Sequence, residues 1–377
     1  MGEGPDDLLR TIGAAYPSRV PRPDLDAVDE LRAAAGIELP ERTIVVVGTN
    51  GKTSTATYLG RLLTAAGARA GVTTSPHLRH WGERVRIDGE PVADAELAAA
   101  VAELHAVARG LPESGSLRFF DLVTLAAARL FAAGGVDAAV FEAGIGGRLD
   151  TTRVLRAPTV VLTGIGLDHT ELLGDTEEAI LRDKLDVAPP GARVFAAPLA
   201  GELAAVARAV AAEHDLDLRF APRASGWREQ NATLAAFALG LAGAGGVDLD
   251  VPGRLERVSV DGVEVVLDAA HNPQGWRALA AALDEPFVAV VSIGADRPPQ
   301  ELAPALARAV GVFATTAWEG RSLPAAELAR TVGGEAVDDP VAATQLGLER
   351  ARATGLPLVV FGSTYLLTHA YEALASS

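Results

Sequence analysis

The 377-residue sequence contains no cysteine. Disulfide bonds, thiolate metal sites and cysteine nucleophiles are therefore excluded, and we expect a protein of the reducing cytoplasm. The sequence also lacks an apolar run long enough to cross a membrane. Residues 1–19 carry acidic side chains and no apolar core, so we expect no secretory signal segment.

Basic side chains are in deficit, because 33 Lys and Arg residues face 49 Asp and Glu residues, with a net charge of −16 and a pI near 4.9. Surfaces that bind nucleic acids gather Lys and Arg densely to neutralise phosphates. We therefore expect no nucleic-acid partner, and the lack of a membrane-spanning apolar run leads us to expect no membrane partner. Any anionic ligand has to be held by a few cations gathered at one place.

The pattern of the chain predicts an α/β protein. Hydrophobic residues make up 49% of the sequence and charged residues 22%, and the length exceeds what one core usually organises. Short β-branched runs alternate with alanine-rich stretches, as in parallel strands joined by helices. We expect strands at residues 43–47, 70–74, 138–143, 159–165, 192–197, 263–269, 287–293, 311–316 and 356–362.

A glycine-rich segment, Ala242 to Gly253, ends in a Pro-Gly turn and predicts a hinge between two domains. We place these domains at residues 1–250 and 251–377. The second is long enough for an α/β unit of its own.

A variant of the Walker phosphate loop follows the first strand. The Walker loop has four residues between its two glycines, whereas here only two residues separate them. The physics is retained: glycines let N–H groups approach phosphates, the following helix presents its positive end, and Lys52 neutralises charge. Either Thr53 or Ser54 could ligand a magnesium ion. The expected phosphate-binding residues of this turn are Gly48, Thr49, Asn50, Gly51, Lys52, Thr53 and Ser54.

Polar residues also end two later strands. Glu142 closes an apolar run before a glycine-rich turn, where the Walker B acid binds magnesium in other nucleotide-binding proteins. Asp168 and His169 follow the next apolar run. Magnesium prefers oxygen donors, so His169 taken alone is better explained as structural. Lys184, two turns into a helix that starts at Thr176, would by itself be a solvated charge.

Taken together, these segments resemble the Mur ligase superfamily and, within it, the folylpolyglutamate synthase/dihydrofolate synthase family. They follow in family order along nearly the whole chain. The matches are GTNGKTS at 48–54, TTSPHL at 73–78, ERVRIDGEPV at 83–92, FFDLVTLAA at 119–127, EAGIGGRLDTT at 142–152, GIGLDHTELLG at 164–174, QNA at 230–232, PGRLE at 252–256, LDAAHNPQG at 267–275 and VVFGSTYLL at 359–367.

The resemblance implies a P-loop-type, mostly parallel ATP-binding domain followed by a smaller Rossmann-like α/β domain. It implies an ATP-dependent, ADP-forming ligase that adds L-glutamate to dihydropteroate, to reduced folates or to both. A carboxylate takes the γ-phosphoryl group of ATP, and the amine of the amino acid attacks the acyl phosphate. We therefore expect ATP, L-glutamate and a pterin-type or folate-type carboxylate as small-molecule partners, Mg²⁺ as cofactor, and a cytoplasmic monomer.

The resemblance also implies roles for single residues. Lys52 and the turn amides hold the β- and γ-phosphates, with Ser54 near the nucleotide magnesium. Three residues match ligands of a second magnesium: Ser75, Glu142 and His169. Lys184 matches the lysine that family members carbamylate with carbon dioxide, which turns an ammonium group into an oxygen donor.

Further roles are implied at and beyond the predicted hinge. Arg254 matches a residue that reaches the phosphates, Asp268 and His271 match residues that line the nucleotide, and Asn231 matches an adenine contact. The expected catalytic residues are Lys52, Lys184, Arg254 and His271.

Some positions depart from the family pattern. Thr53 stands where folate-type members usually have Gly, Asp121 replaces the usual Glu of an FFE signature, and Leu185 and Asp186 replace small residues. These departures leave open an alternative, a Mur-type ligase that uses another carboxylate in a specialised pathway. A nucleotide-binding regulatory protein without catalysis is a third reading. The presence of Lys52 together with the predicted metal and carbamate residues argues against it.

Overall fold

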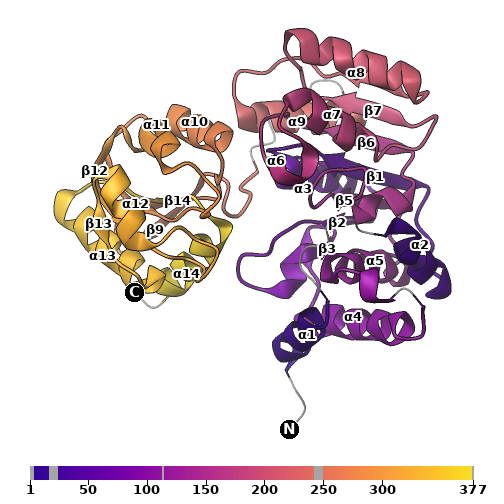
Figure 1. Cartoon of the computed structure of the whole chain (residues 1–377), viewed down its shortest axis with the longest axis horizontal. Helices are drawn as coiled ribbons and strands as arrows, with labels where there is room; N and C mark the ends of the chain where they lie inside the picture. Colours follow the sequence, from indigo (N-terminus) through magenta and orange to yellow (C-terminus); the bar gives the residue numbers. More distant parts are fainter. Residues whose placement is uncertain (1–3, 17–23, 113, 242–248, 376–377) are drawn as a thin grey trace. The chain divides into compact units, whose positions relative to one another are not determined.

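The computed structural model describes residues 4–16, 24–112, 114–241 and 249–375. The chain divides into two compact units, Met1–Asp248 and Leu249–Ser377. We call them unit 1 and unit 2; Figure 1 colours them from indigo to pink and from orange to yellow. Of the predicted hinge, residues 242–248 lie outside the described residues. Both units are α/β with mostly parallel sheets, which confirms the predicted fold class.

Within the described residues, unit 1 is built on an eight-stranded sheet with the order β4-β3-β2-β5-β1-β6-β7-β8. Its strands from β2 to β8 in this order are parallel, and β3 and β4 form an antiparallel edge. The bounds are β1 Arg42–Val47, β2 Ala70–Thr73, β3 Val85–Ile87, β4 Glu90–Pro91, β5 Ala138–Glu142, β6 Thr159–Leu162, β7 Arg193–Ala196 and β8 Asp217–Phe220.

Helices cover both faces of this sheet (Figure 1). Neighbouring residues of β2 show the two faces, because Val72 packs against α3 and Gly71 lies against Phe131 of α5. On the far strands, Phe195 meets Phe237 of α9. The helices of unit 1 are α1 Pro5–Ala14, α2 Leu25–Ala34, α3 Lys52–Ala65, α4 Asp94–Ala108, α5 Phe119–Ala133, α6 Thr170–Leu173, α7 Glu177–Leu185, α8 Gly201–Glu213 and α9 Trp227–Ala238.

The central strands bring three chain segments to one edge of the sheet. In the parallel register Val46 faces Glu142, and Val47 faces Leu162. The turn after β1, the end of β5 and the segment after β6 therefore meet at the carboxyl ends of adjacent strands, where open α/β sheets bind ligands.

Unit 2 has, in its described part, a six-stranded sheet with the order β13-β12-β11-β14-β10-β9, in which only β9 is antiparallel to its neighbour. Its strands are β9 Glu256–Val260, β10 Val263–Asp268, β11 Phe287–Val291, β12 Ala309–Ala314, β13 Glu335–Ala336 and β14 Leu358–Phe361. Its helices are α10 Pro273–Ala282, α11 Ala303–Leu306, α12 Ala325–Val332, α13 Pro340–Thr354 and α14 Thr364–Ala375.

All the strands predicted from apolar runs are present. Residues of β5 and β6 are buried throughout, and this explains why these strands are continuous apolar runs rather than alternating ones. In the described residues, no helix is long and apolar enough to span a bilayer.

Candidate active site

The turn after β1 requires its two glycines. Gly48 and Gly51 have φ angles of 148° and 88°, in the region that favours glycine. A Cβ atom on Gly48 would lie 1.8 Å from the hydroxyl of Thr163, and one on Gly51 would lie 2.6 Å from Oδ1 of Asn231. The predicted phosphate turn is thus packed directly against the segment after β6 and against α9.

Hydrogen bonds fix this turn to the segment after β6. The Thr49 N–H donates to the Gly164 carbonyl at 2.8 Å, and the Thr49 hydroxyl bonds to Gly166. The Thr163 hydroxyl donates to the Asn50 carbonyl at 2.7 Å. The backbone is held in place from both sides.

Helix α3 begins at Lys52, and no side chain caps it at Gly51. The first N–H groups of a helix have no intrahelical acceptors, and the helix dipole favours an anion at this end. Lys52 Nζ donates to the carbonyls of Gly48 and Thr49 at 3.1 and 3.2 Å. The turn therefore gathers backbone donors and one ammonium group, as a phosphate site requires.

Glu142 lies next to this turn and is only 4% exposed. The Thr53 hydroxyl donates to both of its carboxylate oxygens, at 2.9 and 3.1 Å. The Ser75 N–H donates to Oε2 at 2.9 Å. The structure thus brings together two of the predicted metal ligands, Ser75 and Glu142, with a residue of the phosphate turn.

Ser54 is the residue of the turn whose hydroxyl fits a magnesium ion best. Its side chain is 2% exposed, and Oγ has no hydrogen-bond partner among the residues that the structure describes. A buried hydroxyl without a partner is unfavourable unless a ligand completes it. The described residues form no cluster of three His, Asp or Glu side chains suited to a metal. A magnesium ion held by few protein groups and by phosphate oxygens is consistent with this donor set.

Lys184 of α7 is buried, with 4% exposure. Desolvation, followed by the nearby charge of Lys52, lowers the pKa of Lys184 from 10.5 to about 7. Lys52 and Lys184 are the only two lysines of the sequence, in which the other basic residues are arginines. The effect of Lys52 on the pKa of Lys184 shows that the two lysines lie close enough for one charge to act on the other.

Close approach of a glycine pair to α7 positions Lys184. A Cβ on Gly146 would lie 2.5 Å from a carboxylate oxygen of Asp183, and one on Gly147 would lie 2.5 Å from the carbonyl of Lys184. The Gly147 N–H donates to Asp183 at 2.9 Å. Only glycines let the turn after β5 pack against this helix.

His169 precedes α6 and has a φ angle of 50°, which is uncommon for a residue with a Cβ. Its N–H donates to Asp168 at 2.9 Å, and its side chain is 25% exposed. Asp168 is 6% exposed and lies near enough to act on the pKa of Lys184. Unusual backbone conformations of this kind concentrate at functional sites.

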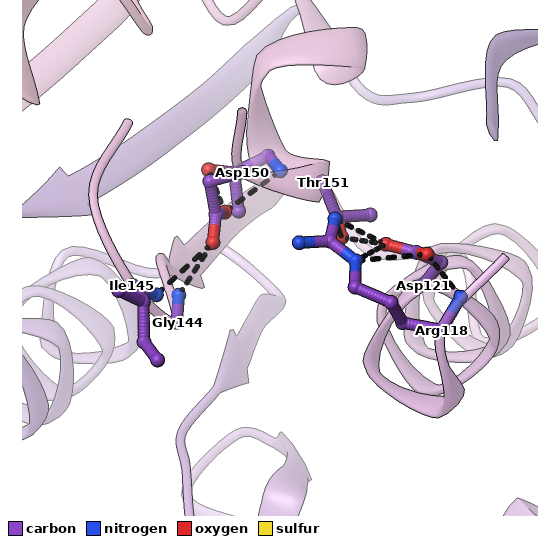
Figure 2. A network of polar contacts seen from close by, with 7 residues as sticks. Arg118, Asp121, Gly144, Ile145, Asp150 and Thr151 are labelled. Atoms are coloured by element: carbon purple, nitrogen blue, oxygen red, sulfur yellow. Dashed lines mark hydrogen bonds and ion pairs between the residues drawn. The ribbon is translucent and has the colours of Figure 1, made fainter. Parts of the chain in front are cut away.

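Asp150 also holds the turn after β5, a role that the sequence did not reveal. It is 1% exposed and accepts hydrogen bonds from the N–H groups of Gly144 and Ile145 at 3.0 and 3.3 Å (Figure 2). The N–H group of Thr152 donates to it as well, at 3.0 Å. Burial raises the pKa of Asp150. An acid followed by two threonines after a glycine pair was the available signal, since Asp commonly closes such turns.

The neighbouring Asp121, noted above as a departure, is fully buried. Arg118 donates to it at 2.7 Å, and the Thr151 hydroxyl also donates to it (Figure 2). This network ties the start of α5 to the segment that follows Asp150. Asp121 is therefore occupied by protein partners.

Trp81 anchors its own loop. Its indole N–H donates to Asp6 at 2.6 Å, and its ring contacts Phe119 and His77. Desolvation, with the charge of Arg84, lowers the pKa of His77 to about 3, so this histidine is neutral and accepts a hydrogen bond from Arg84 at 2.8 Å. These contacts anchor the loop that carries Trp81.

In unit 2, the three residues singled out by the sequence lie at the end of β10 and in two loops connected to it. Asp268 ends β10, is 6% exposed, and accepts hydrogen bonds from the N–H groups of Leu255 and Ala270 at 2.8 Å each. Nδ1 of His271 lies 2.9 Å from the Ala269 carbonyl. The bond from Leu255 ties the loop of Arg254 to this strand end. Their roles toward a nucleotide, and the adenine contact of Asn231 in unit 1, stay predictions.

Comparison with known proteins agrees with this geometry. The family described as Mur ligase, glutamate ligase domain, matches residues 253–364. The folylpolyglutamate synthase of Lacticaseibacillus casei is 30% identical over an alignment 398 positions long, which covers 91% of this chain and 92% of that protein. The structure of Escherichia coli FolC in complex with DHPP and ADP superposes with a TM-score of 0.85 at 26% identity, over 100% of this chain and 98% of that chain. A bifunctional folylpolyglutamate synthase/dihydrofolate synthase with Mn, AMPPNP and L-glutamate bound has a TM-score of 0.82 at 28% identity, over 94% of each chain.

Proposed function

The chain belongs to the folylpolyglutamate synthase/dihydrofolate synthase family of ATP-dependent, ADP-forming ligases, and we propose that it adds L-glutamate to dihydropteroate, to reduced folates or to both. One observation carries the proposal: Thr53, which follows Lys52 directly at the phosphate turn, donates to the buried Glu142 at the end of β5. The charge of Lys52 also acts on the buried Lys184, the only other lysine of the sequence. A phosphate-binding turn, an acid and a second, buried lysine are the groups that acyl-phosphate chemistry needs.

The reaction has two steps. A substrate carboxylate attacks the γ-phosphorus of ATP, and the bond to the bridging oxygen breaks so that ADP leaves. The amine of L-glutamate then attacks the acyl carbon, loses a proton and expels phosphate. Phosphoryl transfer depends chiefly on positioning and on neutralising charge. Lys52 and the N–H groups at the start of α3 supply both.

The residues of unit 1 that match the family's metal ligands would serve two magnesium ions. Ser54 would hold the ion of the nucleotide, and Glu142, Ser75 and His169 would hold the second. When bound, the ions neutralise charge on the transferring phosphoryl group. The manganese and AMPPNP in a solved relative support a divalent metal and ATP for this chain.

Lys184 is suited to carbamylation. With a pKa of about 7, roughly half of its amine is neutral at neutral pH. A neutral amine attacks carbon dioxide, forms a carbamate N–C bond and releases a proton. The product carries an anionic oxygen, the donor that Mg²⁺ prefers.

Residues of unit 2 complete the proposal. Arg254 would contact the phosphates, and Asp268 and His271 would line the nucleotide, whereas Asn231 of unit 1 would contact the adenine. We place the enzyme in the cytoplasm because ATP and L-glutamate are available there. The predicted monomeric state stays a prediction.

The test is ADP release by the full chain with ATP, Mg²⁺, bicarbonate and L-glutamate, in the presence of dihydropteroate, tetrahydrofolate or no acceptor. We expect release that depends on the acceptor, and a product heavier by one glutamyl unit in mass spectrometry. Silence with both acceptors, from protein that still binds ATP, would refute the folate assignment and favour another carboxylate.

A further inference from the structure

Thr53 stands at the junction between the phosphate turn and the acidic end of β5. We propose that Thr53 is a positioning residue whose hydroxyl fixes the carboxylate of Glu142 in the orientation that binds the second metal ion. The proposal rests on the proposed function, because it assumes that Glu142 is a metal ligand.

Ser75 and Thr53 donate to the carboxylate of Glu142 in different ways. The Ser75 N–H reaches Oε2 alone at 2.9 Å. The Thr53 hydroxyl reaches Oε1 at 2.9 Å and Oε2 at 3.1 Å. A donor that reaches a single oxygen does little by itself to restrict rotation of a carboxylate about its terminal bond, whose torsional preference is broad. The hydroxyl that bridges both oxygens restricts this rotation.

Burial strengthens these hydrogen bonds. Glu142 is 4% exposed, so water does not compete freely for its oxygens, and a buried carboxylate needs hydrogen-bond donors. Groups that bond to a metal-binding carboxylate orient it, and their loss typically lowers metal affinity about 10-fold to 100-fold. Thr53 is placed to have an effect of this size without contacting the ion.

Two hydroxyls of the turn thus have different roles. The Ser54 hydroxyl is buried without a hydrogen-bond partner in the described part of the chain, as expected of a group that awaits a ligand. The Thr53 hydroxyl is bonded to Glu142. Of the two candidates for the nucleotide magnesium, the geometry favours Ser54 and assigns Thr53 to the carboxylate.

The position of Thr53 also links two sites. It follows Lys52 directly, in the first turn of α3, where the N–H groups have no intrahelical acceptors and would bind the phosphates. A single rigid helix start therefore sets both the phosphate cradle and the orientation of Glu142.

The experiment titrates Mn²⁺ into the full chain with a saturating non-hydrolysable ATP analogue and follows unbound Mn²⁺ by electron paramagnetic resonance. Thr53→Val removes the hydroxyl and keeps the shape, whereas Thr53→Ser keeps the hydroxyl. Thr57→Val is the matched control, because Thr57 lies one turn later on α3 and its hydroxyl donates to the Thr53 carbonyl at 2.8 Å. Circular dichroism checks that each variant is folded, and binding of the analogue in EDTA reports nucleotide affinity without metal.

We expect Thr53→Val to lower the Mn²⁺ affinity of the site that contains Glu142 about 10-fold or more. The Mn²⁺ affinity of Thr53→Ser and of Thr57→Val should stay close to that of the unsubstituted chain. Unchanged Mn²⁺ affinity in Thr53→Val would overturn the proposal. So would a loss of analogue binding in EDTA, because it would show that Thr53 contacts the nucleotide. If the unsubstituted chain bound no Mn²⁺, the proposed function itself would fail, and the two failures are thereby distinguished.

Discussion

Replacing Lys184 with Met tests what a buried ammonium group does to this fold. Desolvation, aided by the charge of Lys52, lowers the pKa of Lys184 from 10.5 to about 7. At about 1.4 kcal/mol for each pKa unit, this difference corresponds to about 5 kcal/mol. A methionine of similar length carries no charge and avoids this cost.

The sign of the pH dependence of stability follows from proton binding. Between pH 7 and 10.5 the unfolded chain protonates Lys184 more fully than the folded chain does. The contribution of Lys184 to the free energy of unfolding therefore rises with pH across this window. Relative to lysine, Met should stabilise the chain by about 5 kcal/mol below pH 7, and this advantage should disappear above pH 10.5.

The assay is urea unfolding of both chains in buffer free of carbon dioxide, at several pH values across this window. Groups that do not interact with Lys184 titrate alike in both chains, so the difference isolates Lys184 together with its coupling to Lys52, Asp183, Asp168 and Asp150. Lysine labelled with ¹³C at Cε offers a direct check, since a chain with two lysines gives two signals. A difference in unfolding free energy that stays constant with pH, or a Lys184 signal that titrates near 10.5, would refute the reasoning.

Three further substitutions test other parts of the structure. Gly51→Ala should abolish nucleotide binding and lower stability more than Gly67→Ala. Both glycines have φ near +87°, so both substitutions add about 1–2 kcal/mol of backbone strain, but only at residue 51 would the methyl group meet another atom within 4 Å. Calorimetry measures the loss of nucleotide binding, and thermal unfolding measures the loss of stability. Asp121→Asn should cost about 3 kcal/mol or more in urea unfolding, since it leaves the charge of Arg118, whose side chain is only 14% exposed, without a carboxylate partner, whereas Asp217→Asn, in an exposed pair, should leave stability unchanged. Arg254→Ala should reduce turnover far more than ATP affinity, and equal losses in steady-state kinetics and in nucleotide titration would contradict its expected role at the phosphates.

The strands that form the centre of each sheet could be predicted, and the edge strands could not. Central parallel strands are buried on both faces, so each is a continuous apolar run that stands out in the sequence. Edge strands such as β8, with the sequence DLRF, and the two-residue β4 and β13 alternate in exposure or are mostly polar. Their pairing depends on the neighbouring strand rather than on their own composition.

At the site, the turn and Glu142 could be predicted because glycines, a lysine and a strand-end acid each have a local signature. Burial of Lys184 has no such signature, since a lysine on a short polar helix is normally solvated. It is buried because Gly146 and Gly147 let another segment pack against α7. The bond between Thr53 and Glu142 was equally hidden, because it joins residues 89 positions apart in the sequence.

The cost of burying Lys184 is itself evidence about its role. An ammonium group that lowers stability by about 5 kcal/mol near neutral pH removes a large part of the 5–15 kcal/mol that typically holds a domain together. A methionine or leucine would fill the same space without this loss, so packing alone does not explain a lysine here. Strongly shifted pKa values concentrate at functional sites because chemistry requires them. A lysine that is half neutral at neutral pH can react with carbon dioxide, whereas a solvated one stays almost wholly protonated. We therefore expect Lys184→Met to be the more stable protein and the inactive one, the trade-off that is common where a site is strained for function.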